Sequence, residues 1–258
     1  MVFAKKRFGQ HFLINQGVAD KIVNSLSFHN NYDAVVEVGP GTGVLTARLM
    51  ELKRGKLIAV ELDKESIIFL KENFDVNKFT LIEGDFLKLD LAEFPSSLGI
   101  IGNFPYNISS QIFFKILEHK EKVMEVVGML QKEVARRIAS AEGSKEYGIL
   151  SVLVQAYYNV ELLFEVSPGS FRPPPKVQSS IIRLKRNNTT NLDCDEVLFR
   201  RLVKQGFQNR RKTLWNALKP INLPDQFRSS EFMSKRAEQL SVKDFEKLTK
   251  QVEEWKKR

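Results

Sequence analysis

The glycine-rich turn Gly39-Pro-Gly-Thr-Gly43 is the feature that most constrains how this chain can fold. An apolar run over residues 33–38 predicts a buried strand before it, and regularly spaced leucines predict one face of a helix after it. Glycines let the backbone approach a ligand, and a helix N-terminus offers free N–H groups. The pattern predicts an α/β, Rossmann-like sheet with nucleotide contacts at Gly39, Gly41 and Gly43. Its spacing differs from that of the dinucleotide motif, and a tight strand–helix turn is the alternative.

Two further predicted strands, at residues 57–60 and 79–82, also end in acidic residues. Glu61 follows the first about 20 residues after the glycines, where an acid can accept hydrogen bonds from ribose hydroxyls. Asp85 and Phe86 follow the second strand. Asp85 can accept a hydrogen bond from an adenine amino group, and Phe86 can pack against the adenine ring. Surface acids that cap helices or turns are the alternative. Ligands of such sheets bind at the strands' carboxyl ends, so the coincidence favours a binding site.

The tetrapeptide Asn103-Phe104-Pro105-Tyr106 follows a fourth predicted strand at residues 98–101. The carboxamide oxygen of Asn103 can accept from an amine, and Pro105 fixes its own φ and extends the residue before it. Tyr106 offers a ring face for a planar base. This combination is typical of an enzyme that acts on the exocyclic amine of a nucleobase. A proline-containing loop with one buried tyrosine is the alternative.

The predicted sheet is completed by a fifth strand at 123–130 and by a closing antiparallel pair at 160–166 and 177–184. A loop with three consecutive prolines separates the members of this pair. Phe171 at its apex can cover the second face of a stacked base, and a core phenylalanine beneath the loop is the alternative. We predict a catalytic domain over residues 1–185, with an N-terminal arm at 1–14, and a small all-helical domain over residues 186–258.

The charge of the chain fits a polyanionic partner such as RNA. Lysine and arginine number 40 against 31 acidic residues, a formal net charge of +9. The alternative is a soluble basic protein without such a partner, which could carry the same net charge. Two clusters are candidate RNA contacts, one in the arm and one beside aromatic residues of the helical part: Lys5, Lys6 and Arg7, and Arg210, Arg211 and Lys212.

Other site classes have little support in the sequence. The single cysteine, Cys194, excludes an internal disulfide, and the three histidines lack metal-ligand spacing, so we expect no metal site. No apolar run approaches the length of a membrane span, and the N-terminus lacks the apolar core of a signal peptide. We therefore expect a cytoplasmic protein.

Nine motifs stand in fixed order along nearly the whole chain. They are Phe8-Gly-Gln-His-Phe-Leu13, Glu37-Val-Gly-Pro-Gly-Thr-Gly43, Glu61-Leu-Asp63, Gly84-Asp85, Asn103-Phe-Pro-Tyr-Asn-Ile-Ser109, Gln131-Lys-Glu-Val134, Tyr147-Gly148, Phe171-Arg-Pro-Pro-Pro-Lys-Val177 and Phe207-Gln-Asn-Arg-Arg-Lys212. With these motifs the chain resembles the small-subunit ribosomal RNA adenine dimethyltransferases of the bacterial KsgA type. The resemblance implies a Rossmann-like methyltransferase that uses S-adenosylmethionine to dimethylate two adjacent adenines near the 3′ end of small-subunit rRNA, during small-subunit biogenesis.

The resemblance also implies donor-site residues in the arm and at the strand ends. They are Gln10, His11, Leu13, Gly39, Glu61, Asp85 and Asn103. The chain departs from the family pattern twice: His11 stands where the arm usually has Asn, and Phe104 stands where Leu or Ile is usual. We expect the first to make that contact through the backbone only or to alter it, and the second to repack the pocket floor while leaving Asn103 and Tyr106 in place.

Asn103, Pro105, Tyr106 and Phe171 are the expected catalytic set, with the base held by stacking and its amine held by the carboxamide oxygen. Two other functions remain open at this stage. One is a large-subunit adenine methyltransferase of the macrolide-resistance type, and the other is a non-catalytic ribosome-assembly factor. We expect a monomer whose partner is small-subunit rRNA or the immature subunit.

Overall fold

The computed structural model describes residues 2–5 and 8–257. The chain divides into two compact units, of which the first comprises Met1–Ala135 with Asn159–Arg186 and the second Arg136–Tyr158 with Asn187–Arg258. The first holds the sheet and the second is helical. The predicted division at 185/186 is therefore wrong for residues 136–158, because the helix within that segment packs with the C-terminal helices.

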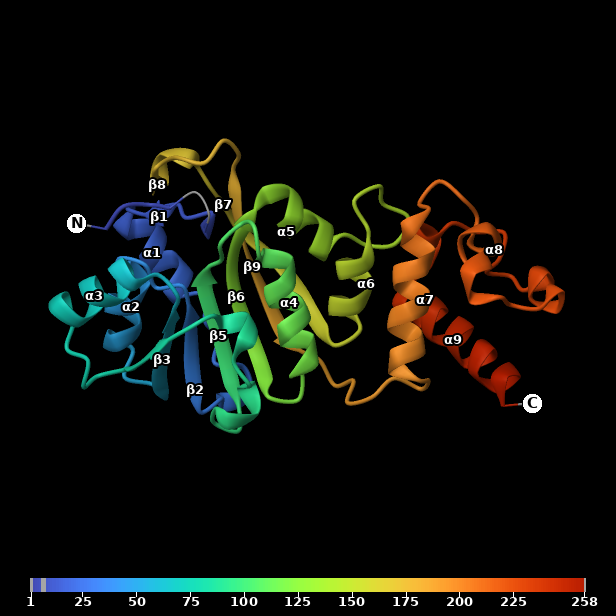
Figure 1. The fold of residues 1–258 in the computed structure, drawn as a ribbon, viewed down its shortest axis with the longest axis horizontal. Helices are drawn as coiled ribbons and strands as arrows, with labels where there is room; N and C mark the ends of the chain where they lie inside the picture. The colour runs from blue at the N-terminus through green and yellow to red at the C-terminus, as the bar shows by residue number, and fades with distance from the viewer. Residues whose placement is uncertain (1, 6–7, 258) are drawn as a thin grey trace. The chain divides into compact units, whose positions relative to one another are not determined.

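A seven-stranded sheet with the order β4-β3-β2-β5-β6-β9-β7 organises the first unit (Figure 1). Strands β2 to β6 pair in parallel, and β9 runs antiparallel to β6. The predicted Rossmann-like sheet and the antiparallel closure at its end are confirmed. The strands are β2 (Ala34–Val38), β3 (Lys56–Glu61), β4 (Thr80–Glu83), β5 (Leu98–Asn103), β6 (Val123–Gln131), β7 (Tyr158–Val166) and β9 (Ser179–Arg186).

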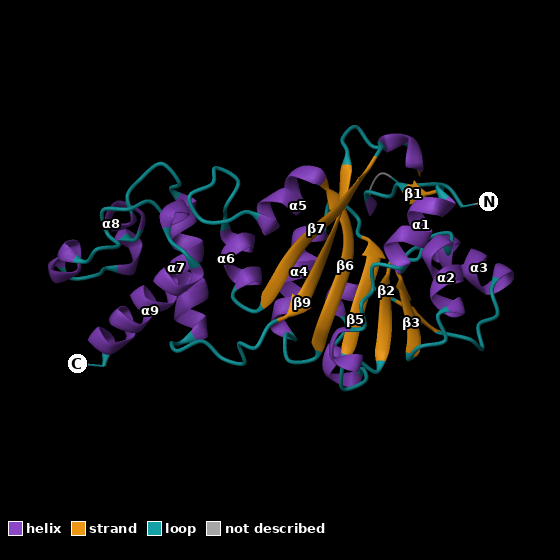
Figure 2. Cartoon of the chain, turned by 180° about the vertical axis from the view of Figure 1, so that it is seen from behind, coloured by secondary structure: helices purple, strands orange, loops and turns teal. Residues whose placement is uncertain are grey.

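Helices cover both faces of this sheet. Helix α4 lies over one face in Figure 1, while α1 and α2 lie over the face seen in Figure 2. Buried residues of α1 and α2 join alternate residues of the strands in one apolar cluster, as expected for central strands buried on both sides. The helices are α1 (Gln16–Val23), α2 (Val44–Glu51), α3 (Lys64–Asn73), α4 (Ser109–Glu118) and α5 (Lys132–Ala139), with short 3₁₀ turns at His29–Asn31, Phe86–Lys88, Leu91–Glu93 and Pro168–Ser170.

The N-terminal arm folds back onto the domain. Strand β1 (Phe12–Leu13) pairs antiparallel with β8 (Phe171–Arg172), with Leu13 opposite Phe171. The backbone N–H of Ile14 adds a 2.8 Å hydrogen bond to the Ser170 carbonyl oxygen. This two-stranded ribbon joins the arm to the proline-rich loop and fixes where the arm crosses the sheet edge.

The second unit consists of helices packed around α7. Its elements are α6 (Ile149–Gln155), α7 (Glu196–Gln208), α8 (Leu214–Ala217) and α9 (Val242–Lys256), with 3₁₀ turns at Lys219–Ile221, Asp225–Ser229 and Ala237–Gln239. Ser241 caps α9 by accepting from the Asp244 N–H. The rings of Tyr147, Phe207 and Phe245 form a chain of aromatic contacts in its core.

Candidate active site

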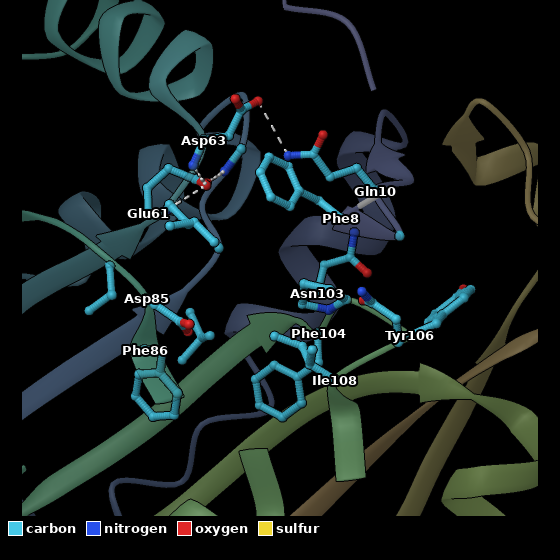
Figure 3. Close-up of a pocket in the computed structure, with 18 of the residues that line it drawn as sticks. Phe8, Gln10, Glu61, Asp63, Asp85, Phe86, Asn103, Phe104, Tyr106 and Ile108 are labelled. Carbon is cyan, nitrogen blue, oxygen red and sulfur yellow. Dashed lines mark hydrogen bonds between the residues drawn. The ribbon is translucent and has the colours of Figure 1, made fainter. Parts of the chain in front are cut away.

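A pocket opens at the carboxyl ends of β2, β3 and β5 and beside the 3₁₀ turn after β4 (Figure 3). The arm forms another of its walls. Predicted site residues from widely separated parts of the chain meet here: Gln10, His11, Gly39, Gly41, Glu61, Asp85, Phe86, Asn103, Pro105 and Tyr106. The strand ends therefore bring the predicted donor and base contacts into one cavity, as the parallel topology requires.

The glycine turn presents bare backbone to the pocket. Gly39 has φ +69°, and no heavy atom lies within 4 Å of the point where a Cβ would stand, so a side chain there would project into open space. Gly41 has φ +57°, and a Cβ on it would lie 2.9 Å from the Phe12 ring of the arm. Gly43 caps α2 and does not line the pocket, because the Phe74 ring occupies the space beside it.

Glu61 binds the backbone around it with both carboxylate oxygens. One accepts from the Gly41 N–H at 2.9 Å, and the other accepts from the N–H groups of Leu62 and Asp63 at 2.9 and 2.8 Å. Burial raises the pKa of Glu61 despite these three bonds. The carboxylate thus holds the glycine turn against the end of β3, and Glu61 itself lines the pocket.

Asp63 fastens the arm across the pocket edge. Lys5 forms an ion pair with the buried Asp63 carboxylate and lies 3.0 Å from Glu65. The Gln10 side chain donates to Asp63 at 3.4 Å and accepts from the Lys5 N–H at 2.8 Å. Burial alone would raise the pKa of Asp63, but the bonds from Lys5 and Gln10 outweigh it and the net pKa is lowered. Lys5, which was predicted to contact RNA, instead binds Asp63 and Glu65 and thereby holds the arm against the end of β3.

Asp85 and Phe86 form the side of the pocket at the end of β4. Asp85 caps the following 3₁₀ turn by accepting from the Leu87 N–H at 3.0 Å. Phe86 is buried and lines the pocket next to Asp85 (Figure 3). Asp85 therefore matches both interpretations of the sequence: one of its carboxylate oxygens caps the turn, and the residue also lines the cavity.

Asn103 is the last residue of β5, and its side chain is oriented by the arm. Its Nδ2 donates to the His11 carbonyl oxygen at 2.7 Å. A carbonyl can only accept, so the amide nitrogen is identified, and Oδ1 is left on the other side of the carboxamide as an acceptor. The contribution of His11 to this bond is through its backbone, which explains why a histidine is compatible with the site.

Phe104 is fully buried beneath the pocket. Its ring lies where side chains on Gly102 and Gly128 would stand, with ring atoms 3.0 and 2.6 Å from the two ideal Cβ positions, and it meets Phe113 edge-on. The two glycines on neighbouring strands make room for a ring at this position. The predicted repacking of the pocket floor is therefore accommodated, and Asn103 and Tyr106 keep their positions in the pocket wall.

Tyr106 lies beside the Asn103 carboxamide and is held from the far side. Its hydroxyl shares a 2.5 Å hydrogen bond with the Ser179 hydroxyl at the start of β9. Burial raises the pKa of Tyr106, although the bond to Ser179 acts in the opposite direction. The phenol therefore stays neutral at physiological pH. A neutral ring with a fixed hydroxyl is a rigid surface for stacking.

Besides Gly43, two predicted site residues of the donor and base contacts lie outside the pocket. Phe171 is 3% exposed and packs in the core beneath the β1–β8 ribbon, as the alternative of a core phenylalanine describes, and its role as a stacking surface stays a prediction. Leu13 is equally buried in the same cluster. Pairing between these two residues turns both side chains toward the sheet.

The basic cluster of the helical unit divides by role. Arg210 donates to the carbonyl oxygens of Lys145 and Tyr147 at 2.5 and 2.6 Å and pairs with Glu238 at 3.1 Å. Its guanidinium thus joins three segments of the unit. Arg211 and Lys212 are exposed. Of the arm cluster, Lys6 and Arg7 lie outside the described residues.

Sequence reasoning missed several residues of the pocket wall. Phe8 closes the arm side, and Ile108 and Gln111 stand at the beginning of α4. Gln111 is an exposed polar residue beside the apolar face of its helix. A polar residue in the first turn of the helix that follows the Asn103–Tyr106 segment could have indicated that Gln111 lines the pocket.

Two negative findings apply to the described residues alone. Among them, no three His, Cys, Asp or Glu side chains are grouped so that they could hold a metal ion. No helix there is both long and apolar enough to span a membrane.

Solved structures share this architecture. The chain is similar to a dimethyladenosine transferase from Plasmodium falciparum, with 29% identity, a TM-score of 0.78 and coverage of 96% of this chain and 98% of that one. It also resembles the 23S rRNA methyltransferase ErmE in fold, with 21% identity, a TM-score of 0.66 and coverage of 92% and 99%. The sheet order and the pocket at its strand ends define a Rossmann-like methyltransferase fold.

The chain belongs to the ribosomal RNA adenine dimethylase family, whose model matches residues 1–254. It is 53% identical over 249 residues to the "Ribosomal RNA small subunit methyltransferase A" of Cytophaga hutchinsonii, covering 96% of each chain. The protein of the same name from Parabacteroides distasonis is 49% identical over 253 residues, with coverage of 96% and 94%. The resemblance drawn from the motifs is confirmed.

Proposed function

We propose that this protein transfers methyl groups from S-adenosylmethionine to the exocyclic amines of two adjacent adenines near the 3′ end of small-subunit rRNA. Membership of the adenine dimethylase family and the names of relatives about 50% identical support the reaction and the RNA. The observation that carries the proposal is the Asn103 carboxamide, which lines the pocket and is anchored to the arm by its nitrogen, leaving its oxygen as an acceptor.

The residues of the pocket fit the donor. The bare backbone at Gly39 leaves space that a side chain would fill, and Glu61 and Asp85 provide acceptors for hydroxyl and amino groups. Phe86 offers an apolar edge for a planar ring. Bound S-adenosylmethionine supplies a methyl group already activated by the sulfonium charge, so the protein's own task is positioning.

Asn103 and the backbone near Pro105 act on the acceptor amine. Adenine's amino lone pair is delocalised into the ring, which makes it a poor nucleophile. Carbonyl oxygens that accept both N–H protons hold the amine with its lone pair turned toward the methyl carbon. Holding two reactants in this geometry supplies a large part of the acceleration. The proton leaves the nitrogen after the new N–C bond has formed, so the site needs no dedicated general base.

The target adenine must leave its stack to reach this pocket. The fixed Tyr106 ring provides a stacking surface, with a contribution of about 1–3 kcal/mol for a base on an aromatic ring. Exposed Arg211 and Lys212 in the helical unit are proposed contacts for the RNA backbone. We further propose a monomeric enzyme that works in the bacterial cytoplasm on small-subunit rRNA or the immature subunit.

Methyl transfer to defined RNA tests the proposal. Purified protein and labelled S-adenosylmethionine are incubated with unmodified small-subunit RNA, with immature small subunits and with large-subunit RNA, and the nucleosides are analysed by mass spectrometry. The proposal predicts N6,N6-dimethyladenosine at two adjacent positions of the small-subunit RNA. Methylation confined to large-subunit RNA would establish the other substrate class. Absence of both cofactor uptake and methylation would indicate a non-catalytic assembly factor.

A further inference from the structure

The helical unit holds a second hollow, between the 3₁₀ turn Asp225–Ser229 and the C-terminal half of α9. Its volume of about 600 Å³ lies within the range of about 300–1,000 Å³ that is typical of ligand sites. The Ser230 hydroxyl donates to the Gln251 side chain at 3.4 Å, which joins the two walls of this hollow, the Trp255 groove. Of the described residues, none lines both this groove and the pocket at the strand ends, so the proposed methyl transfer gives the groove no task.

An aromatic pair forms the floor of the Trp255 groove. Phe227 is buried, and its ring meets that of Trp255 edge-on, with centroids 6.0 Å apart and planes inclined by 80°. Trp255 is half-buried and lines the groove, so part of its surface is accessible there. The buried phenylalanine holds the indole in place. Trp is also the aromatic residue that attracts cations most strongly, so the floor suits a flat cationic group.

The rim of the groove is negative, although the chain is basic. Glu231 and Glu254 are exposed and line the groove, whereas none of its described lining residues is Lys or Arg. The nearby Lys250 and Lys257 pair with carboxylates outside the groove, at 2.5 and 2.6 Å. The groove therefore has the opposite sign to the net charge of +9. It repels a phosphate backbone and attracts a cation.

We propose that the Trp255 groove docks an arginine-bearing segment of a basic protein partner. The guanidinium lies on the indole, where stacking and cation–π attraction favour Arg over Lys. Its N–H groups donate to the carboxylates of Glu231 and Glu254. The groove is larger than one side chain requires, and the amides of Gln226 and Gln251 offer donors and acceptors for a peptide backbone. This inference goes beyond the proposed function and does not depend on it.

Binding of defined peptides to the full chain tests the proposal. The probe is a fluorescein-labelled octapeptide of alternating arginine and glycine, with lysine and glutamate versions for comparison, and binding is followed by polarisation. Trp255→Leu removes the indole, and Glu231→Gln with Glu254→Gln removes the charge while keeping the side-chain size. Glu51→Gln with Glu72→Gln, two exposed acids of the other unit, is the matched control. Thermal melting and affinity for a small-subunit RNA fragment are measured on each variant.

Wild type is expected to bind the arginine peptide more tightly than the lysine peptide, less tightly as salt is added, and not to bind the glutamate peptide. Trp255→Leu and the double variant of Glu231 and Glu254 are each expected to raise the Kd for the arginine peptide about three- to tenfold, without weakening RNA binding. The control double variant should stay within twofold of wild type. The charge variant keeps the test valid if Trp255→Leu does not fold.

The proposal is overturned if wild type does not bind the arginine peptide, or if the control double variant weakens binding as much as the groove double variant does. Equal affinity for arginine and lysine peptides, together with an unchanged Kd for a folded Trp255→Leu, would show that the indole takes no part and would also overturn it. Weakened RNA binding by Trp255→Leu, with peptide binding unchanged, would assign the groove to a nucleic-acid base instead.

Discussion

The Nδ2 atom of Asn103 lies 2.7 Å from the backbone carbonyl oxygen of His11, 92 residues earlier in the chain. This hydrogen bond joins the N-terminal arm to the end of β5. It satisfies the donor side of the carboxamide and sets the direction of the acceptor side. The arm is therefore part of the proposed catalytic geometry as well as a wall of the pocket.

The ion pair between Lys5 and Asp63 is expected to hold the arm in its working position. Lys5→Ala leaves the buried Asp63 carboxylate without its cationic partner, so we predict cofactor affinity weakened about five- to tenfold. Lys64→Ala, an exposed neighbour at the start of α3, is the control and should change affinity less than twofold. Calorimetric titration with S-adenosylmethionine checks both. Equal affinity of the two variants would show that the ion pair does not set the arm.

Adjacent arginines in the helical unit should give opposite results. Arg210→Ala removes a guanidinium bound to two backbone carbonyls and is expected to lower the free energy of unfolding by about 1–3 kcal/mol. Arg211→Ala should leave stability within about 0.5 kcal/mol and reduce the salt dependence of RNA binding by a slope of about one. Urea unfolding and binding at several salt concentrations measure the two effects. A stable Arg210→Ala with weakened RNA binding would reverse the assignment.

Glu37 should make stability depend on pH. Burial raises its pKa to about 8, although the Thr46 hydroxyl donates to it at 2.7 Å. The pKa of Glu37 in the folded state lies above its unfolded value of 4.5. The stability that this group contributes is therefore fully present below pH 4.5 and is lost as the pH rises from 4.5 toward 8. We expect the free energy of unfolding to fall by a few kcal/mol over this range through this group.

The Glu37→Gln substitution tests this, since Gln can still accept from Thr46 and does not titrate. Its urea midpoint should fall less between pH 5 and pH 8.5 than that of wild type. Glu72→Gln, on the exposed side of α3, should retain the wild-type profile. Identical profiles for wild type and Glu37→Gln would mean that Glu37 does not titrate in this range.

Most of the sheet could be predicted from sequence because each central strand is a short apolar run followed by glycine or polar residues. The parallel topology then places Gly39, Glu61 and Asp85 at one edge without further information. Asn103 could be predicted for the same reason. What sequence could not give is the partner of its amide, since the arm contact depends on a bond between residues far apart in the chain.

The open alternatives and the errors have physical causes of the same kind. The burial of Phe171 follows from its pairing with Leu13, which no local pattern encodes. Arg210 was grouped with its basic neighbours, but the carbonyls it binds come from a segment assigned by sequence to the other domain. The room for Phe104 depends on a glycine of the adjacent strand, Gly128. In each instance the deciding contact is tertiary.

The central claim is that the Asn103 carboxamide orients the acceptor amine, and single-turnover methyl transfer by Asn103→Ala tests it most directly. The rate on a small-subunit RNA fragment is compared with the Kd for S-adenosylmethionine measured on the same preparation, with Gln111→Ala as a pocket-wall control. The account predicts a rate lowered by about 10²-fold or more for Asn103→Ala, a cofactor Kd changed by much less, and a near-normal control. A near-normal rate for Asn103→Ala, with RNA and cofactor bound, would contradict it.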